Sequence, residues 1–299
     1  MYQLFHHFRI QVSQGQIFWR EVGDGPAIVF LHGSWTDSSQ WVPLMQHLSL
    51  DHHCFAPDTL GSGESRAFTK IHPSINLQVE CLAEYIQTLK IKELCLVGNG
   101  LGAWIATSYA LKYPEMVKGL VVIAPEGITF PNYQKEWGWK RQLASNFSPL
   151  AGFLKLIYPL AFLFGQGKKI KAWFSDRQIL LEWPVASQLL YRRRWAEIQE
   201  EILNQPLESL KLPTLVLQGD EDTATALNQS QTFSQIAPRA QYQRIEGGKP
   251  NLPRQMPEVI AQYIREFITY QVHFSEPPSP EILDQDRPQD GYSYPETAW

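Results

Sequence analysis

A chain of 299 residues, 44% hydrophobic and 19% charged, is long enough to bury one large core. Its formal net charge of −4 gives no basis for a nucleic-acid partner. The three cysteines, Cys54, Cys81 and Cys95, are an odd number without metal-ligand spacing, so neither a metal nor another cofactor is expected. Cys95 lies in an apolar run and is interpreted as a small core residue.

The first residues lack the apolar core and cleavage site of a signal peptide. No apolar run approaches the roughly 18–20 residues that a membrane-spanning helix needs. From these features and the cysteines we expect a reducing, cytoplasmic setting.

Apolar runs and helical periodicity alternate along most of the chain. The runs predict strands at 8–12, 16–22, 27–31, 53–57, 94–97, 120–124, 214–218 and 242–245. The periodic segments predict helices at 41–48, 77–89, 103–110, 227–236 and 259–269. Strands that alternate with helices at short spacing favour an α/β fold with a mostly parallel sheet covered on both faces.

Two segments depart from this alternation. Residues 127–206 contain no predicted strand and are rich in tryptophan, leucine and basic residues, which indicates an inserted helical cap. The end of the chain, 274–299, is proline-rich and acidic, which predicts a disordered tail. The expected organisation is therefore a core of 1–126 and 207–273, interrupted by the cap and followed by the tail.

Several short motifs follow the predicted strands in a fixed order. They are His32-Gly33, Asp58-x-x-Gly61-x-Gly63-x-Ser65, Gly98-Asn99-Gly100-Leu101-Gly102, Gly219-Asp220-Glu221-Asp222 and Gly247-Gly248-Lys249-Pro250. Together they resemble the α/β-hydrolase superfamily, whose nucleophile sits in a G-x-S-x-G strand–turn–helix elbow. The spacing is most similar to the branch with haloalkane dehalogenases, epoxide hydrolases and carbon–carbon bond hydrolases. The resemblance covers 8–272 except for the cap and implies an eight-stranded, mostly parallel sheet flanked by helices.

The resemblance places the catalytic triad on three positions, two of which have lost their function. The nucleophile position is Gly100 and the position of the base is Pro250, whereas Asp222 retains the acid. The backbone donors of the oxyanion hole would be Leu101 and either Ser34 or Trp35.

Other residues do not rebuild a triad. None of the eight histidines lies between 73 and 272, so only His32 is expected near the elbow, where the resemblance implies a structural role. The local alternatives to the nucleophile are Ser34, Asn99, Asp220 and Cys95. Glu126, which follows a predicted strand, is an alternative acid, because some relatives place the acid there.

Glycine is favoured at the centre of the elbow when that position carries no catalytic side chain. The central residue of this turn has a backbone conformation that is strained for other residues. We expect His32, Asn99, Glu126, Trp137 and Trp173 to line a pocket. The apolar stretch 149–164 either lines a cavity beneath the cap or contacts a membrane surface beside basic residues.

Three hypotheses of function follow. The leading one is a pseudo-hydrolase that binds a small apolar ligand beneath the cap, a protein partner, or both. The second is an enzyme that uses a reduced constellation of Asp222, His32 and the backbone oxyanion hole. The third is an assembly or scaffold protein that acts through the aromatic residues of its C-terminal tail.

Overall fold

The computed structural model describes residues 4–68, 72–145, 156 and 167–274. The chain divides into two compact units. The first unit comprises the described residues up to Thr129 and from Ile202 onward, and the second comprises those in Phe130–Glu201. The first unit contains the β-sheet, and the described elements of the second are all helical.

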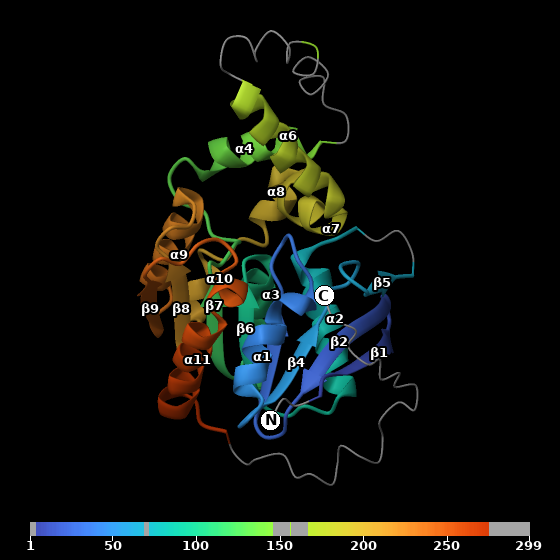
Figure 1. Ribbon diagram of the computed structural model, residues 1–299, viewed down its shortest axis with the longest axis vertical. Helices are drawn as coiled ribbons and strands as arrows, with labels where there is room; N and C mark the ends of the chain where they lie inside the picture. The colour runs from blue at the N-terminus through green and yellow to red at the C-terminus, as the bar shows by residue number, and fades with distance from the viewer. Residues whose placement is uncertain (1–3, 69–71, 146–155, 157–166, 275–299) are drawn as a thin grey trace. The chain divides into compact units, whose positions relative to one another are not determined.

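The sheet has nine strands in the described part of the chain, one more than expected (Figure 1). They are β1 (His6–Val12), β2 (Gly15–Val22), β3 (Ala27–Leu31), β4 (His53–Pro57), β5 (Arg66–Ala67), β6 (Leu94–Asn99), β7 (Val117–Ile123), β8 (Thr214–Gly219) and β9 (Ala240–Ile245). The additional strand is β5, which is too short to produce a sequence pattern and pairs with β2. The other strands lie in the order β1-β2-β4-β3-β6-β7-β8-β9. Strand β2 is antiparallel to its neighbours, and all pairs from β4 to β9 are parallel, which confirms the expected mostly parallel sheet.

Helices follow the strands of the first unit, and some of them begin at a residue whose side chain caps the helix. They are η1 (Ser38–Trp41), α1 (Val42–Leu48), α2 (Ile75–Thr88), α3 (Leu101–Lys112), η3 (Pro206–Ser209), α9 (Ala224–Ile236), α10 (Leu252–Gln255) and α11 (Pro257–Gln271). The Ser74 hydroxyl accepts the N–H of Leu77 at the start of α2, and the Thr223 hydroxyl accepts that of Ala226 at the start of α9. Each cap satisfies one backbone donor that has no partner within its helix.

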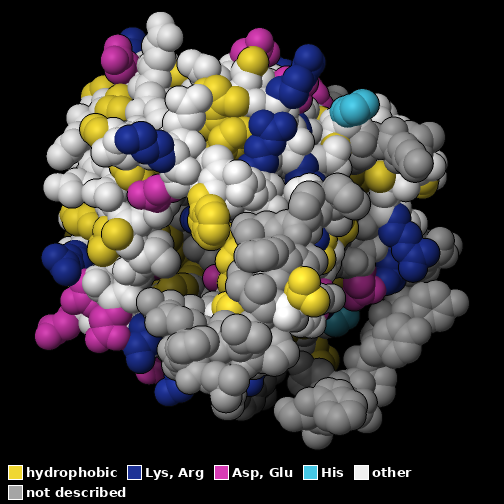
Figure 2. All heavy atoms as spheres, turned by 90° about the horizontal axis from the view of Figure 1, so that it is seen from above, with side chains coloured by type: hydrophobic (Ala, Val, Ile, Leu, Met, Phe, Trp, Pro, Cys, Tyr) yellow, Lys and Arg dark blue, Asp and Glu magenta, His cyan; other side chains and the backbone are white. Residues whose placement is uncertain are grey.

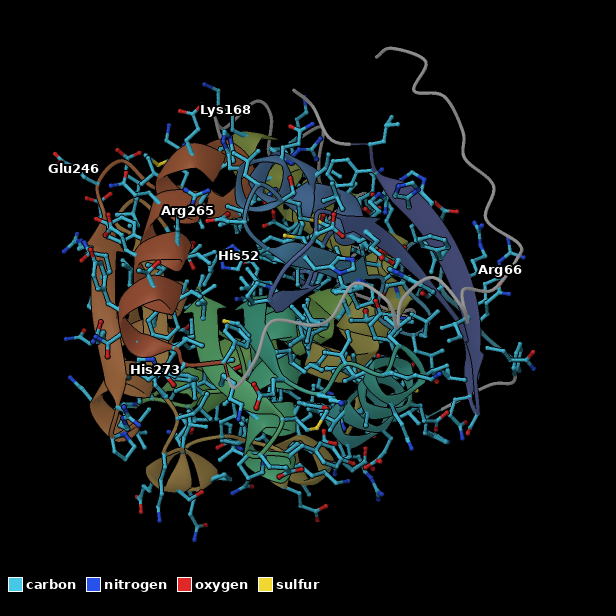
Figure 3. All side chains as sticks on the ribbon, turned by 90° about the horizontal axis from the view of Figure 1, so that it is seen from below. His52, Arg66, Lys168, Glu246, Arg265 and His273 are labelled. Carbon is cyan, nitrogen blue, oxygen red and sulfur yellow. The ribbon has the colours of Figure 1, made fainter. Side chains whose placement is uncertain are left out.

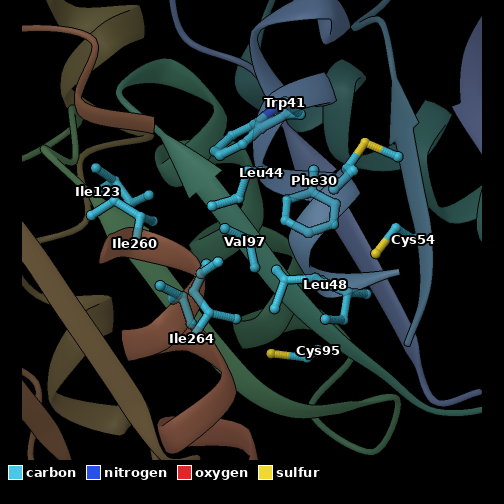
Figure 4. Close-up of a cluster of buried hydrophobic side chains, with 14 of the residues drawn as sticks. Phe30, Trp41, Leu44, Leu48, Cys54, Cys95, Val97, Ile123, Ile260 and Ile264 are labelled. Atoms are coloured by element: carbon cyan, nitrogen blue, oxygen red, sulfur yellow. The ribbon is translucent and has the colours of Figure 1, made fainter. Parts of the chain in front are cut away.

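One hydrophobic core cluster lies between one face of the sheet and helices α1 and α11 (Figure 4). Alternate residues of β6, Cys95 and Val97, point into this core, as the two-residue period of a strand requires. Leu44 from α1 and Ile260 and Ile264 from α11 cover them. The same strand is buried on both faces, which explains its continuous apolar sequence.

Arg265 ties α11 to the end of α1. Its guanidinium donates to the backbone oxygen of His47 at 2.7 Å and to the carboxylate of Asp51 at 3.1 Å. Figure 3 shows Arg265 projecting from α11 on this side of the first unit. The bond to His47 satisfies a carbonyl in the last turn of α1, where the helix dipole favours a cation.

Where the structure describes it, the second unit consists of helices and helical turns. They are α4 (Tyr133–Ala144), α6 (Gly167–Glu182), α7 (Pro184–Ser187), the π-helical turn η2 (Gln188–Arg192) and α8 (Trp195–Gln199). Two arginines cap the end of α4: Arg177 donates to the carbonyl of Ser145 at 2.7 Å, and Arg192 donates to that of Ala144 at 2.6 Å. On the face drawn in Figure 2, the coloured Lys and Arg side chains are scattered and do not form a single patch.

Some expectations fall on residues that the structure does not describe. The apolar stretch 149–164 lies outside the described residues except for Leu156, and so does the tail from 275 onward. Within the described ranges, no helix is both long enough and apolar enough to cross a membrane.

Because α3 packs closely on the sheet, a methyl group added at this contact should destabilise the protein. A Cβ at Gly102 would lie 2.1 Å from the carbonyl oxygen of Leu31, so Gly102→Ala is expected to lower the free energy of unfolding by about 3 kcal/mol. Urea denaturation followed by tryptophan fluorescence and circular dichroism measures this loss.

Gly138→Ala is the matched control. Gly138 lies inside α4, and a Cβ there meets no atom within 4 Å, so alanine should stabilise the helix by about 0.5–1 kcal/mol. Equal effects of the two substitutions would refute the packing argument.

Candidate functional site

The candidate site lies where the parallel strands β3, β6, β7 and β8 end, because their carboxyl ends share one edge of the sheet. Gly100 links β6 to α3 there, with φ +53° and ψ −114°, a conformation that favours glycine. Its N–H donates to the oxygen of Ile123 at 3.0 Å, and its oxygen accepts the N–H of Glu126 at 3.1 Å. The elbow turn is therefore preserved and bonded to the loop that follows β7.

The position above Gly100 has room for a Cβ atom. A Cβ built there would lie 3.7 Å from the Cδ and Oε1 atoms of Glu126 and 3.8 Å from Oγ of Ser34, which are ordinary contact distances. Gly98 differs, since its Cβ would lie 2.5 Å from Cα of Ala103. Crowding thus explains Gly98 and Gly102, whereas backbone conformation explains Gly100.

A serine–carboxylate pair lies beside this space. Ser34, in the loop after β3, donates from Oγ to Oε2 of Glu126 at 2.7 Å. Ser34 is buried and Glu126 is half-buried. The sequence drew attention to each residue separately, but their pairing was not expected, because 92 positions separate them.

The backbone donors of the presumptive oxyanion hole are unused. Leu101 is the first residue of α3, so its N–H has no acceptor within the helix. Within the described part of the chain, the N–H groups of Leu101, Ser34 and Trp35 have no hydrogen-bond acceptor. These three groups can therefore donate to a bound molecule.

His32 supports the neighbouring loop. Its Nε2 accepts the N–H of Thr59 at 3.0 Å, and its Nδ1 lies 2.9 Å from the carbonyl oxygen of Gly33. An Nε2 that accepts a backbone proton is unprotonated, so the ring is neutral and Nδ1 donates to Gly33. This use of both nitrogens indicates a structural role and leaves none for a substrate proton.

Asn99 and Gln40 also shape the loop after β3. The Gln40 side chain accepts the N–H of Gly33 at 3.1 Å. A Cβ at Gly33 would lie 2.9 Å from Nδ2 of Asn99, so the Asn99 side chain packs across the backbone of Gly33. This placement makes Asn99 a packing residue of the loop.

Asp222 is bound within its own turn. Its carboxylate accepts the N–H of Thr223 at 2.6 Å and a side-chain N–H of Gln218 at 3.3 Å. The neighbouring Asp220 lies 4.0 Å from Arg244. Pro250 is exposed in the loop between β9 and α10. Asp222 is thus engaged with its own turn and with Gln218, and Pro250 has no side-chain hydrogen-bonding group.

The motif Asp58-x-x-Gly61-x-Gly63-x-Ser65 is structural. The Asp58 carboxylate is buried and accepts the N–H groups of Ser38 and Glu64, both at 2.7 Å. The Ser65 hydroxyl accepts the N–H of Phe18 at 2.9 Å. A Cβ at Gly63 would lie 2.1 Å from the Asp58 carboxylate, which explains the glycine.

The two tryptophans that were expected to line a pocket belong to the second unit. Trp137 is buried, donates to the carbonyl of Leu190 at 2.7 Å and has its ring centroid 4.9 Å from that of Trp195. Trp173 is half-buried, and its ring stands perpendicular to that of Phe174. Trp137 is therefore part of the packing of its own unit, and a pocket-lining role for either residue remains a prediction.

The cysteines are poor nucleophiles. All three are buried. Burial raises the pKa of Cys95 to about 12, and burial together with nearby glutamates raises that of Cys81 to about 11. Burial also raises the pKa of Cys54. The reactive thiolate is thus disfavoured, which agrees with the interpretation of Cys95 as a core residue.

Gly100 and Ala124 both have a positive φ, which predicts how substitutions at these two positions change the free energy of unfolding. Gly100→Ala and Gly100→Ser should lower the free energy of unfolding by about 1–2 kcal/mol, because φ at this position is positive. Ala124→Gly should raise it or leave it unchanged, because Ala124 has φ +45°. Chemical denaturation of the three variants measures both effects, and a Gly100→Ala variant as stable as the wild type would contradict the strain argument.

The chain is similar to known proteins in sequence and in fold. The family model described as alpha/beta hydrolase fold matches residues 26–252. The chain is 24% identical over 222 residues to the 2-hydroxy-6-oxo-2,4-heptadienoate hydrolase of Pseudomonas putida, an alignment that covers 72% of this chain and 79% of that protein.

Two solved structures share the fold at low sequence identity. A thermophilic esterase from Thermogutta terrifontis has a TM-score of 0.67 at 20% identity, with 89% of this chain and 100% of the esterase covered. A meta-cleavage product hydrolase from Pseudomonas fluorescens IP01 has a TM-score of 0.65 at 18% identity, with 88% of this chain and 98% of that chain covered. Because the family model matches most of its length, the chain belongs to the alpha/beta hydrolase fold family.

Proposed function

We propose that this chain is a non-catalytic member of its family, which binds a small and largely apolar ligand with the ligand's polar end above Gly100. One observation carries the proposal: the elbow keeps unused N–H donors, but it has no nucleophile. The space above Gly100 is bordered by Ser34 and Glu126, and the N–H of Leu101 has no acceptor in the described part of the chain.

Two of the three triad positions argue against covalent catalysis. Gly100 has no side chain, and Pro250 has no group that accepts a proton. Loss of either the nucleophile or the base of a triad lowers the rate by several orders of magnitude, because the members act as a unit. His32 does not replace the base, since both of its ring nitrogens are engaged with backbone groups or Thr59.

The retained features fit binding. An open position flanked by donors and acceptors can hold the polar end of a ligand in a defined orientation. Contact of the cap with a membrane and of the tail with a protein partner are additional proposals, which rest on the composition of segments outside the described residues.

The proposal predicts binding without turnover. With p-nitrophenyl butyrate, release of p-nitrophenolate should equal the rate in buffer alone. With 1-hexanol or 2-hexanone, the amide NMR signals of Gly100 and Leu101 should shift in a saturable manner, whereas that of Gly119, near the amino end of β7 and away from the elbow, should not. The titrations report binding at the elbow and the absorbance assay reports hydrolysis.

Two results would contradict the proposal. If neither ligand shifts these signals, the elbow is not a binding site for such ligands. Ester turnover that is lost in Glu126→Gln would replace the binding function with hydrolysis by a water molecule that Glu126 activates.

A further inference from the structure

The two units of the chain differ in the sign of their charge. The range Phe130–Glu201, to which the second unit belongs, contains 11 lysines and arginines and 6 acidic residues, a net charge of +5. The other 15 basic and 24 acidic residues of the chain give a net charge of −9. A basic unit in an acidic protein indicates that this unit meets an anionic partner.

We propose that the second unit attaches the protein to an anionic lipid surface through cations and apolar side chains on the exposed faces of α4 and α6. The inference concerns side chains that the structure describes in the second unit. It does not depend on a ligand at the elbow.

Most of the excess positive charge lies on these two helices. The sequences of α4 and α6 together contain seven basic and three acidic residues, a net charge of +4. Near the end of the unit, acidic residues are used in local ion pairs: Arg193 lies 2.6 Å from Glu201, and Arg194 lies 2.6 Å from Glu197. The arginines of that segment are therefore largely neutralised, and α4 and α6 carry the attraction for an anion.

Helix α6 presents cations and an apolar side chain to solvent on one side. Arg177 and Leu180 lie on its buried side. Lys168, Lys171 and Ile179 are exposed, and their spacing of three and eight residues places them together on the opposite side. Within the described ranges, neither lysine forms an ion pair. This side of α6 therefore combines unneutralised charge with an apolar contact.

Helix α4 adds an exposed tryptophan. Trp139 is 52% exposed, and Lys135 lies one turn before it on the same face. Trp137, by contrast, is buried and donates to the carbonyl of Leu190. Tryptophan is enriched at the headgroup level of membranes, because its ring is apolar and its N–H is polar. Trp139 is therefore placed to insert at such a surface.

The mixture of side chains favours lipid over other anionic partners. A nucleic acid attracts the cations of a surface through its phosphates, whereas Ile179 gains only from apolar surroundings. A lipid surface offers anionic headgroups and acyl chains together, so both kinds of side chain are satisfied.

Co-sedimentation with vesicles tests the inference on the full-length protein. The vesicles consist of phosphatidylcholine alone or of phosphatidylcholine with about 30 mol% phosphatidylglycerol. We expect the partition coefficient to be at least about tenfold larger for the anionic vesicles at low salt. It should fall at least about tenfold in 0.5 M NaCl, because salt screens the attraction between exposed charges.

A triple lysine variant shows whether the second unit makes the contact. Lys135→Gln/Lys168→Gln/Lys171→Gln should lower the partition coefficient for anionic vesicles at least about tenfold. The matched control removes three exposed lysines of the first unit and changes the net charge equally, so it should lower the coefficient less than about twofold. Its substitutions are Lys92→Gln, Lys211→Gln and Lys249→Gln.

A single aromatic variant tests the apolar part of the contact. Trp139→Ala should lower the partition coefficient about fivefold, because the ring no longer enters the interface. Tyr270→Ala is the matched control, since Tyr270 is an exposed aromatic residue of α11 in the first unit and should leave the coefficient unchanged.

Several outcomes would overturn the inference. They are absence of sedimentation with the anionic vesicles, equal sedimentation with both kinds of vesicle, and equal losses in the two lysine variants. Tighter binding of a single-stranded DNA than of the anionic vesicles, unaffected by Trp139→Ala, would assign the basic surface to a nucleic acid and also overturn it. The amide shifts of Gly100 and Leu101 with 1-hexanol report the proposed function separately, so the two fail independently.

Discussion

The rest of the structure depends on the turn between β6 and α3, where the chain reverses at a positive φ and α3 packs directly against the sheet. Gly98 and Gly102 allow the close approach, because a Cβ at either would overlap backbone atoms. Gly100 provides the reversal itself. A serine at this position would be strained, and that strain is useful only when the side chain does chemistry. Glycine at the centre of the elbow is consistent with a turn that is kept for the fold and for the space above it.

Much of the architecture could be predicted from the sequence. The central strands are buried on both faces, so they appear as continuous apolar runs, and β3 and β4 begin and end at the expected residues. The order of the glycine-containing motifs indicated the family. Strand β5 was missed because two residues carry no periodicity, and β7 begins three residues before the expected run, at Val117.

The candidate site was harder to predict from the sequence, because its contacts join segments that are far apart in the chain. Ser34 and Glu126 meet only when β3 and β7 have both taken their places in the sheet, and no local pattern encodes that meeting. The structural roles of His32 and Asp222 depend in the same way on hydrogen bonds to surrounding backbone and side-chain groups. A motif can show which residues lie at the edge of the sheet. Only the folded chain shows which of their atoms already make hydrogen bonds.

The mass of the intact protein after exposure to an alkyl fluorophosphonate shows whether the elbow can form a covalent bond. Such reagents modify activated serine hydroxyls. We expect an unchanged mass, because Gly100 has no nucleophile and Ser34 donates its proton to a carboxylate with no histidine base beside it. A single stoichiometric adduct that maps to Ser34 would refute a non-catalytic elbow and make this chain a serine hydrolase with a relocated nucleophile.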